Sequence, residues 1–93
     1  MASVKINGVE FTPDPLKTGS SDIAGACYNA SMRMLVIQFS KGDIYSYEPV
    51  SVDAYNEFEK AVSPGSYFHQ NIAKNPNVHA QKREVIKDEK GLG

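Results

Sequence analysis

The stretch SMRMLVIQFSKGDIYSYEPV (residues 31–50) carries the clearest structural signal in the chain. Its first half is apolar on both faces of an extended segment, which is typical of a strand covered on both sides. SKGD is a tight-turn sequence, and IYSYEPV (44–50) has the composition of the next strand. With SDIAGACYNA (21–30) before it, the stretch predicts a three-stranded antiparallel meander over residues 21–50.

Two tyrosines, Tyr45 and Tyr47, share one face of the last strand because side chains alternate along a strand. The length of the preceding turn decides which face this is, since a slip of one residue exchanges the faces. A two- or four-residue turn places the tyrosines on the face of Met34 and Val36. A three-residue loop with a bulge at Gly42 places them on the face of Leu35, Ile37 and Phe39. The rings then either pack into the core or its rim, or form a platform on which a ligand stacks. The shortage of cations nearby favours packing.

After Pro49 the apolar period changes from that of a strand to that of a helix. VDAYNEFEKAV (52–62) predicts a helix capped by Ser51, and SPG (63–65) ends it. SYFHQNIAKN predicts a second short helix over 66–74, ending before a proline. Both helices are expected to pack on one face of the sheet. The residues predicted to share that core are Leu35, Ile37, Phe39, Phe58 and Ile72.

The two ends of the chain carry different signals. VKINGVEFT (4–12) predicts a hairpin about Asn7-Gly8, because both residues tolerate positive φ. TPDPLKTGS (12–20) has the composition of a linker. QKREVIKDEKGLG (81–93) is highly charged and is expected to be a frayed helix or a mobile tail. The fold class predicted is therefore α+β, with an N-terminal hairpin extension.

Composition limits the classes of protein. The chain has 93 residues, enough for one domain, and Cys27 is its single cysteine, so no internal disulfide can form. The N-terminus lacks the pattern of a signal peptide, and no apolar stretch approaches the ~20 residues of a membrane span. Together these features predict a cytoplasmic protein that is not held in a membrane.

No catalytic or metal motif is visible. Cys27, His69 and His79 do not stand at metal-ligand spacing, and a zinc site needs about four ligands. A Cys27–His69 pair is open but has no further support. We therefore expect no enzyme activity, no catalytic residues, no metal and no cofactor.

Charge argues against tight binding to nucleic acid polymers. Residues 20–72 carry three Lys or Arg against six Asp or Glu, although cations supply most of the affinity for phosphates. DNA is not expected as a partner. Any appreciable polymer binding should need the C-terminal cations Lys82, Arg83, Lys87 and Lys90.

The candidate ligand-binding residues are of three kinds: stacking tyrosines, cations that could meet phosphate, and a turn near a histidine that could present backbone N–H groups to an anion. They are Tyr28, Arg33, Lys41, Tyr45, Tyr47, Ser63, Gly65 and His69. The turn has a simpler interpretation, as a connection between helices with Ser66 as N-cap.

Residues 20–72 as a whole resemble the KTSC domain family, named for the C-terminus of some lysyl-tRNA synthetases and also found as small free-standing proteins. The matching residues are Ser20-Ser21, Ile23, Tyr28, the alternating Leu35, Ile37 and Phe39, Gly42, Tyr45, Tyr47, Val50, Tyr55, Phe58, Ala61, Ser63, Gly65, Tyr67-Phe68 and Ile72. Two positions depart from the family pattern: Ser51 replaces its usual proline, and His69 a frequent asparagine. The resemblance implies a β-meander followed by helices, with RNA binding suggested as the function. It divides the chain into an extension (1–19), a KTSC-like domain (20–75) and a charged tail (76–93).

Two functional hypotheses follow. The first is a small non-catalytic binding module that recognises a protein or a small ligand, as a regulator or an inhibitor. The second is an RNA- or nucleotide-binding domain with a tyrosine stacking face. Low positive charge favours the first, and the family precedent favours the second. The sequence leaves open the oligomeric state and whether the host is a bacterium or a phage.

Overall fold

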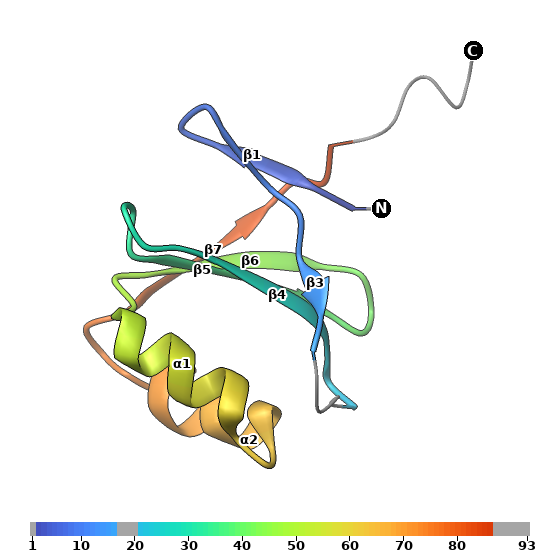
Figure 1. Cartoon of the computed structure of the whole chain (residues 1–93). Helices are drawn as coiled ribbons and strands as arrows, with labels where there is room; N and C mark the ends of the chain where they lie inside the picture. The colour runs from blue at the N-terminus through green and yellow to red at the C-terminus, as the bar shows by residue number, and fades with distance from the viewer. Residues whose placement is uncertain (1, 17–20, 87–93) are drawn as a thin grey trace.

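The computed structural model of the chain describes residues 2–16 and 21–86, arranged in three layers. A five-stranded sheet in the order β3-β4-β5-β6-β7 forms the middle layer. The hairpin of β1 and β2 lies on one of its faces and the helices lie on the other (Figure 1). The predicted α+β class with antiparallel sheets is confirmed.

The three central strands are the predicted meander. They are β4 (Ile23–Asn29), β5 (Met34–Phe39) and β6 (Ile44–Glu48), each antiparallel to the next. The first four residues of β5, from Met34 to Ile37, are at most 1% exposed. Burial on both faces explains why these four positions are all apolar.

The turn between β5 and β6 decides the face of the two tyrosines. Phe39 N donates to Asp43 O at 2.8 Å, which leaves a three-residue loop, and Gly42 has a φ of 105°. Tyr45 consequently pairs with Ile37 and Tyr47 pairs with Leu35. The register with the three-residue loop is the one that forms, and both tyrosines point to the helix side of the sheet.

Two further strands widen the sheet, which has five strands where the sequence predicted three. β3 (Asp14–Pro15) pairs with β4 within the segment expected to be a linker. β7 (His79–Arg83) pairs with β6 along five consecutive residues. The expectation of a frayed helix or mobile tail is therefore wrong for residues 81–83. The outer side of β6 needs a hydrogen-bonded partner, and a charged edge strand supplies it without an apolar pattern.

The helical layer begins with α1 (Val52–Lys60), where Ser51 Oγ accepts a hydrogen bond from Ala54 N at 3.1 Å. This cap is as predicted. α2 (Pro64–Phe68) starts earlier than expected, with Pro64 in its first turn. Ser66 is thus inside the helix, and its predicted role as N-cap is wrong; proline is favoured at the first helical position because its missing N–H is not needed there. The helix continues as a π-helical turn, η1 (His69–Ala73).

The hairpin covers the other face of the sheet. β1 (Val4–Ile6) and β2 (Val9–Phe11) are antiparallel and turn at Asn7-Gly8, whose φ angles are 51° and 82°. This confirms the hairpin read from the sequence. The buried residues of this second core are Val4, Ile6, Phe11, Met34, Val36 and Ile44.

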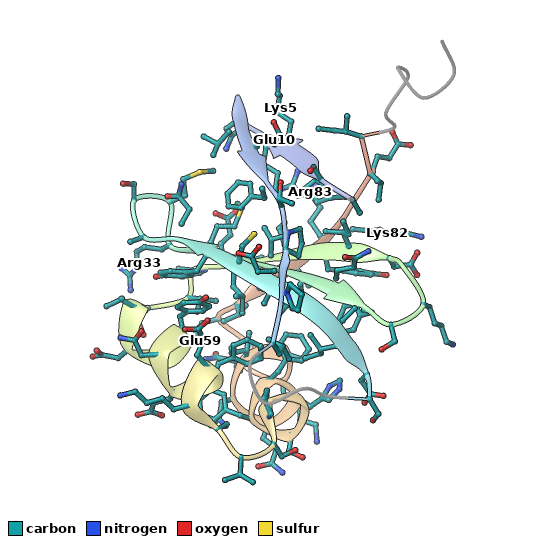
Figure 2. All side chains as sticks on the ribbon, turned by 45° about the vertical axis from the view of Figure 1, so that its right-hand side comes forward. Lys5, Glu10, Arg33, Glu59, Lys82 and Arg83 are labelled. Carbon is teal, nitrogen blue, oxygen red and sulfur yellow. The ribbon has the colours of Figure 1, made fainter. Side chains whose placement is uncertain are left out.

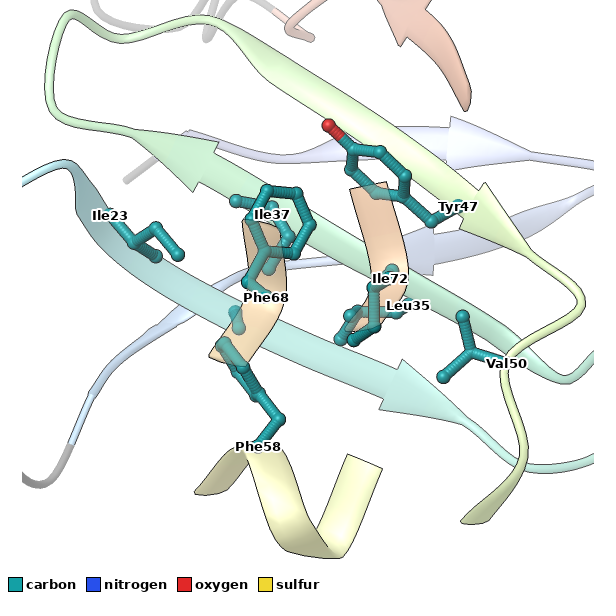
Figure 3. Close-up of a cluster of buried hydrophobic side chains, with 9 residues drawn as sticks. Ile23, Leu35, Ile37, Tyr47, Val50, Phe58, Phe68 and Ile72 are labelled. Carbon is teal, nitrogen blue, oxygen red and sulfur yellow. The ribbon is translucent and has the colours of Figure 1, made fainter. Parts of the chain in front are cut away.

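The main core lies between the sheet and the helices (Figure 3). Four of the five residues predicted for it are buried there: Leu35, Ile37, Phe58 and Ile72. The fifth, Phe39, is half-buried at its margin. The other buried residues of the main core are Ile23, Ala26, Tyr47, Val50 and Phe68.

Candidate functional site

The structure does not bring the eight predicted ligand-binding residues into one site. They lie in four places: Lys41 and His69 line a hollow beside the β5–β6 turn, Tyr28 and Arg33 lie near the start of α1, Ser63 and Gly65 lie at the start of α2, and Tyr45 and Tyr47 pack against the main core. Ser20, which belongs to the family resemblance, and the tail cations Lys87 and Lys90 lie outside the described residues.

The paired tyrosines make contacts within the molecule. Tyr47 is 6% exposed, and its ring meets the ring of Phe68 edge to face with the centroids 4.9 Å apart. Burial, and then the neighbouring Tyr45, raise the pKa of Tyr47 to about 12. Tyr45 is half-buried and meets Phe39 edge to face at 5.7 Å. This geometry is that of core and rim residues.

Tyr28 is engaged at both ends. Its ring stacks on Tyr55 with the centroids 4.7 Å apart and the planes 10° apart. Its hydroxyl donates to the carbonyl of Val50. One face of the Tyr28 ring and its hydroxyl therefore contact α1 and the segment that leads into it, and they are not available to a ligand.

The start of α2 offers few groups to an anion. Pro64 has no N–H, and Gly65 is buried. The Ser63 and Ser66 hydroxyls form a hydrogen bond with each other at 3.0 Å. These contacts are consistent with a connection between two helices.

The hollow beside the β5–β6 turn has a volume of about 370 Å³. Three separate segments form it: the residues before β4, the β5–β6 turn and the first residue of η1. Its lining residues are Ser21, Asp22, Phe39, Ser40, Lys41, Asp43 and His69. Two of them, Lys41 and His69, were candidates from the sequence.

Two hydrogen bonds fix the walls of the hollow to each other. Ser40 Oγ donates to Ser21 O at 2.7 Å, and Ser40 N donates to Asp22 O at 2.8 Å. Phe39 contributes an aromatic side chain, which also meets Phe68 at 5.8 Å. The hollow is therefore built on backbone contacts and on the margin of the main core.

The hollow carries charges of both signs. His69 Nε2 lies 3.8 Å from Asp22 Oδ2, and Lys82 Nζ lies 3.8 Å from Asp43 Oδ1 at its border. In residues 2–16 and 21–86, Lys41 has no ion-pair partner. Lys41 is exposed, and the side chains of Asp22 and Asp43 are 65% and 54% exposed, so a ligand can reach all three.

His69 stands at an irregularity that the sequence did not reveal. It is the first residue of the π-helical turn, and Lys74 N donates to His69 O at 3.2 Å. π-helical turns insert an extra residue into a helix and are often found at functional sites. No local signal in HQNIA distinguishes this turn from an ordinary helix, so sequence reasoning missed it.

Cys27 and His69 lie on opposite sides of the sheet. Cys27 packs against the hairpin core, and His69 lines the hollow on the helix side. Burial, followed by the charge of Asp14, raises the pKa of Cys27 to about 11, so the thiol is protonated at neutral pH. Across the described part of the chain, no three His, Cys, Asp or Glu side chains are grouped as a metal site. In the same residues, no helix has the length and apolarity of a membrane span.

Comparisons with known proteins point to one family. The model of the KTSC domain matches residues 19–75. The solved structure of a KTSC domain protein from Yersinia pestis is similar, with 32% sequence identity and a TM-score of 0.65. The match covers 76% of this chain and 94% of that one. No curated protein matches the chain. The family match ends at residue 75, whereas the sheet continues through β7 to Arg83.

Proposed function

The chain belongs to the KTSC domain family, and we propose that it is a non-catalytic recognition module that binds a small ligand in the hollow beside Lys41 and His69. One observation carries this proposal: three separate segments bring an ammonium, an imidazole, two carboxylates and an aromatic ring around one hollow. Ligand sites commonly combine an apolar wall with a few convergent polar groups. The volume of about 370 Å³ suits a small molecule.

The charges favour a ligand that also carries both signs. Lys41 would receive an anionic group such as a carboxylate, and Asp22 and Asp43 would receive an ammonium. Phe39 would contact an aliphatic side chain between them. A free amino acid has this combination, and so does the terminus of a peptide.

The RNA-binding alternative has less support from the geometry. Tyr47 is almost completely buried, and Tyr28 already stacks on Tyr55. Figure 2 shows Arg33 and Lys82 at opposite ends of the sheet layer, so these cations do not form a cluster. Polymer binding relies on several neighbouring cations, and the carboxylates of the hollow would repel phosphate.

The absence of catalysis is part of the proposal. It is supported by the separation of Cys27 from His69 across the sheet and by the protonated state of the thiol. A thiol that stays protonated is a poor nucleophile.

The test is a nuclear magnetic resonance titration of the full chain with L-leucine and, as control, N-acetyl-L-leucine amide, which has neither charge. We expect L-leucine to shift the backbone signals of residues 21–22, 40–43 and 69, and the uncharged control to leave them in place. Lys41→Met should weaken binding at least about fivefold, since it removes a charge-assisted contact. Lys60→Met, a matched change at the exposed end of α1, should have no effect.

The competing function is measured with a labelled single-stranded RNA at about 0.15 M salt. Micromolar binding of this RNA, without any response to L-leucine up to about 10 mM, would refute the proposal in favour of the alternative.

A further inference from the structure

The outermost strand of the sheet supplies a second recognition surface, distinct from the hollow. We propose that the free edge of β7 binds an extended, acidic segment of a partner protein as an added antiparallel strand. This inference does not rest on the function proposed for the hollow. The ion pair between Lys82 and Asp43 lies where the two surfaces meet.

β7 is the longer and more regular of the two sheet edges. It pairs with β6 without interruption, from Glu48 opposite His79 to Ile44 opposite Arg83. β3, at the other edge, has two residues and one of them is Pro15, which cannot donate a hydrogen bond. Edge strands that avoid unwanted strand addition are usually short, bulged, interrupted by proline or lined with charge, and of these features β7 has only the charge.

The hydrogen-bond pattern shows which backbone groups of β7 face outward. Phe39 N donates to Asp43 O, so Asp43 faces β5. Because adjacent residues of an antiparallel strand turn their backbone groups to opposite sides, Ser46 faces β7 and pairs there with Gln81. The contact of 3.5 Å from Ser46 Oγ to Gln81 O agrees with this assignment.

The same alternation along β7 turns the N–H and C=O groups of Ala80 and Lys82 away from β6. Both residues are exposed, and no other described strand pairs with this side of β7. These groups form the template to which an extended peptide adds in strand addition. Ala80, with its small side chain, leaves room for a residue beside it.

The charge of β7 selects the partner. His79, Lys82 and Arg83 are its ionisable residues, so it has no carboxylate. The acidic Asp43 lies at the inner side and is already 3.8 Å from Lys82. Opposite charges across neighbouring strands are favourable and like charges are unfavourable. An acidic segment is therefore matched to this edge, whereas a second copy of β7 would bring cations against cations.

The probe is a fluorescent peptide of about seven residues that alternates glutamate and threonine. Its binding to the full chain is measured by anisotropy at about 0.05 M salt. We expect binding at least about tenfold tighter than that of the counterpart with lysine in place of glutamate. Two further versions carry N-methyl groups on alternate residues. Only one of these two peptides should fail to bind the protein, because only every second N–H group of an added strand faces β7.

Variants of the protein give an independent measurement. Ala80→Pro removes an outward N–H and should abolish binding while the pairing of β7 with β6 remains. Lys82→Gln should weaken binding several-fold, and Lys5→Gln, a matched change in the separate sheet of the hairpin, should not (Figure 2). Equal binding of both N-methylated peptides would overturn the proposal, since attraction by charge alone would then explain it. A dimer in solution that Ala80→Pro dissociates would also overturn it, by assigning the edge to a second copy.

Discussion

Phe58 is the buried residue of α1, and the effect of its removal on stability can be calculated. Its side chain has no exposed surface and lies in the main core (Figure 3). Burial of a phenylalanine side chain contributes about 1.5–3 kcal/mol. A residual cavity of about 80 Å³ costs about 2 kcal/mol more at ~24 cal/mol per Å³. Phe58→Ala should therefore lower the free energy of unfolding by about 3–5 kcal/mol.

The assay is thermal unfolding followed by circular dichroism. For a domain of this size, each kcal/mol lowers Tm by about 4–8 °C, so we expect a fall of at least about 12 °C. Val62→Ala, just beyond α1, is the control, because Val62 is 96% exposed and should change the free energy by less than about 0.5 kcal/mol. A fall below about 4 °C for Phe58→Ala would show that α1 does not pack on the sheet as described.

Three further predictions concern stability. Burial raises the pKa of Tyr47 from 10.0 to about 12, so the folded state favours the protonated phenol. The protonated phenol therefore contributes about 2–3 kcal/mol to the free energy of unfolding below about pH 10. This contribution is lost as the pH rises through the folded-state pKa of about 12. Urea unfolding across this range should show the decline, and Tyr47→Phe should make it shallower. Gly25→Ala would place a Cβ 2.7 Å from Asp14 O and disturb the pairing of β3 with β4, so it should lower the free energy of unfolding by about 1–3 kcal/mol. Tyr28→Phe removes the hydrogen bond to Val50 O and should cost about 0.5–1.5 kcal/mol in the same unfolding assay.

The predicted and the unpredicted parts of the fold differ in how much apolar surface they bury. β5 was predictable because its residues are apolar on both faces, and α1 because its apolar residues recur at the period of a helix behind the cap Ser51. β7 is exposed at four of its five positions, so burial leaves no period in its sequence. Its place is set by the hydrogen bonds that β6 requires, about 35 residues away along the chain. Pairing at such a distance is invisible to local propensity.

The candidate site shows the same limit. The sequence predicts that Lys41 could meet phosphate and that His69, when protonated, could assist an anion, and both residues line the hollow. Asp22 and Asp43 were counted only as carboxylates that oppose phosphate binding. Their position beside Lys41 and His69 depends on how the β5–β6 turn meets the start of η1 and the residues before β4. Residue types can nominate candidates, but tertiary packing decides which charges become neighbours and hence which ligand they suit.

The three-residue loop between β5 and β6 has a consequence for every partner of this protein. By turning Tyr45 and Tyr47 toward the helices, it fills the space under α2 with aromatic rings and leaves the opposite face to the hairpin. Both faces of the central strands are then closed, as the burial of Met34 to Ile37 requires. A partner can therefore approach this sheet only at an end of its strands or along an edge. The hollow is at such an end and β7 is such an edge, which is why we assign recognition to these two places and not to the tyrosine face.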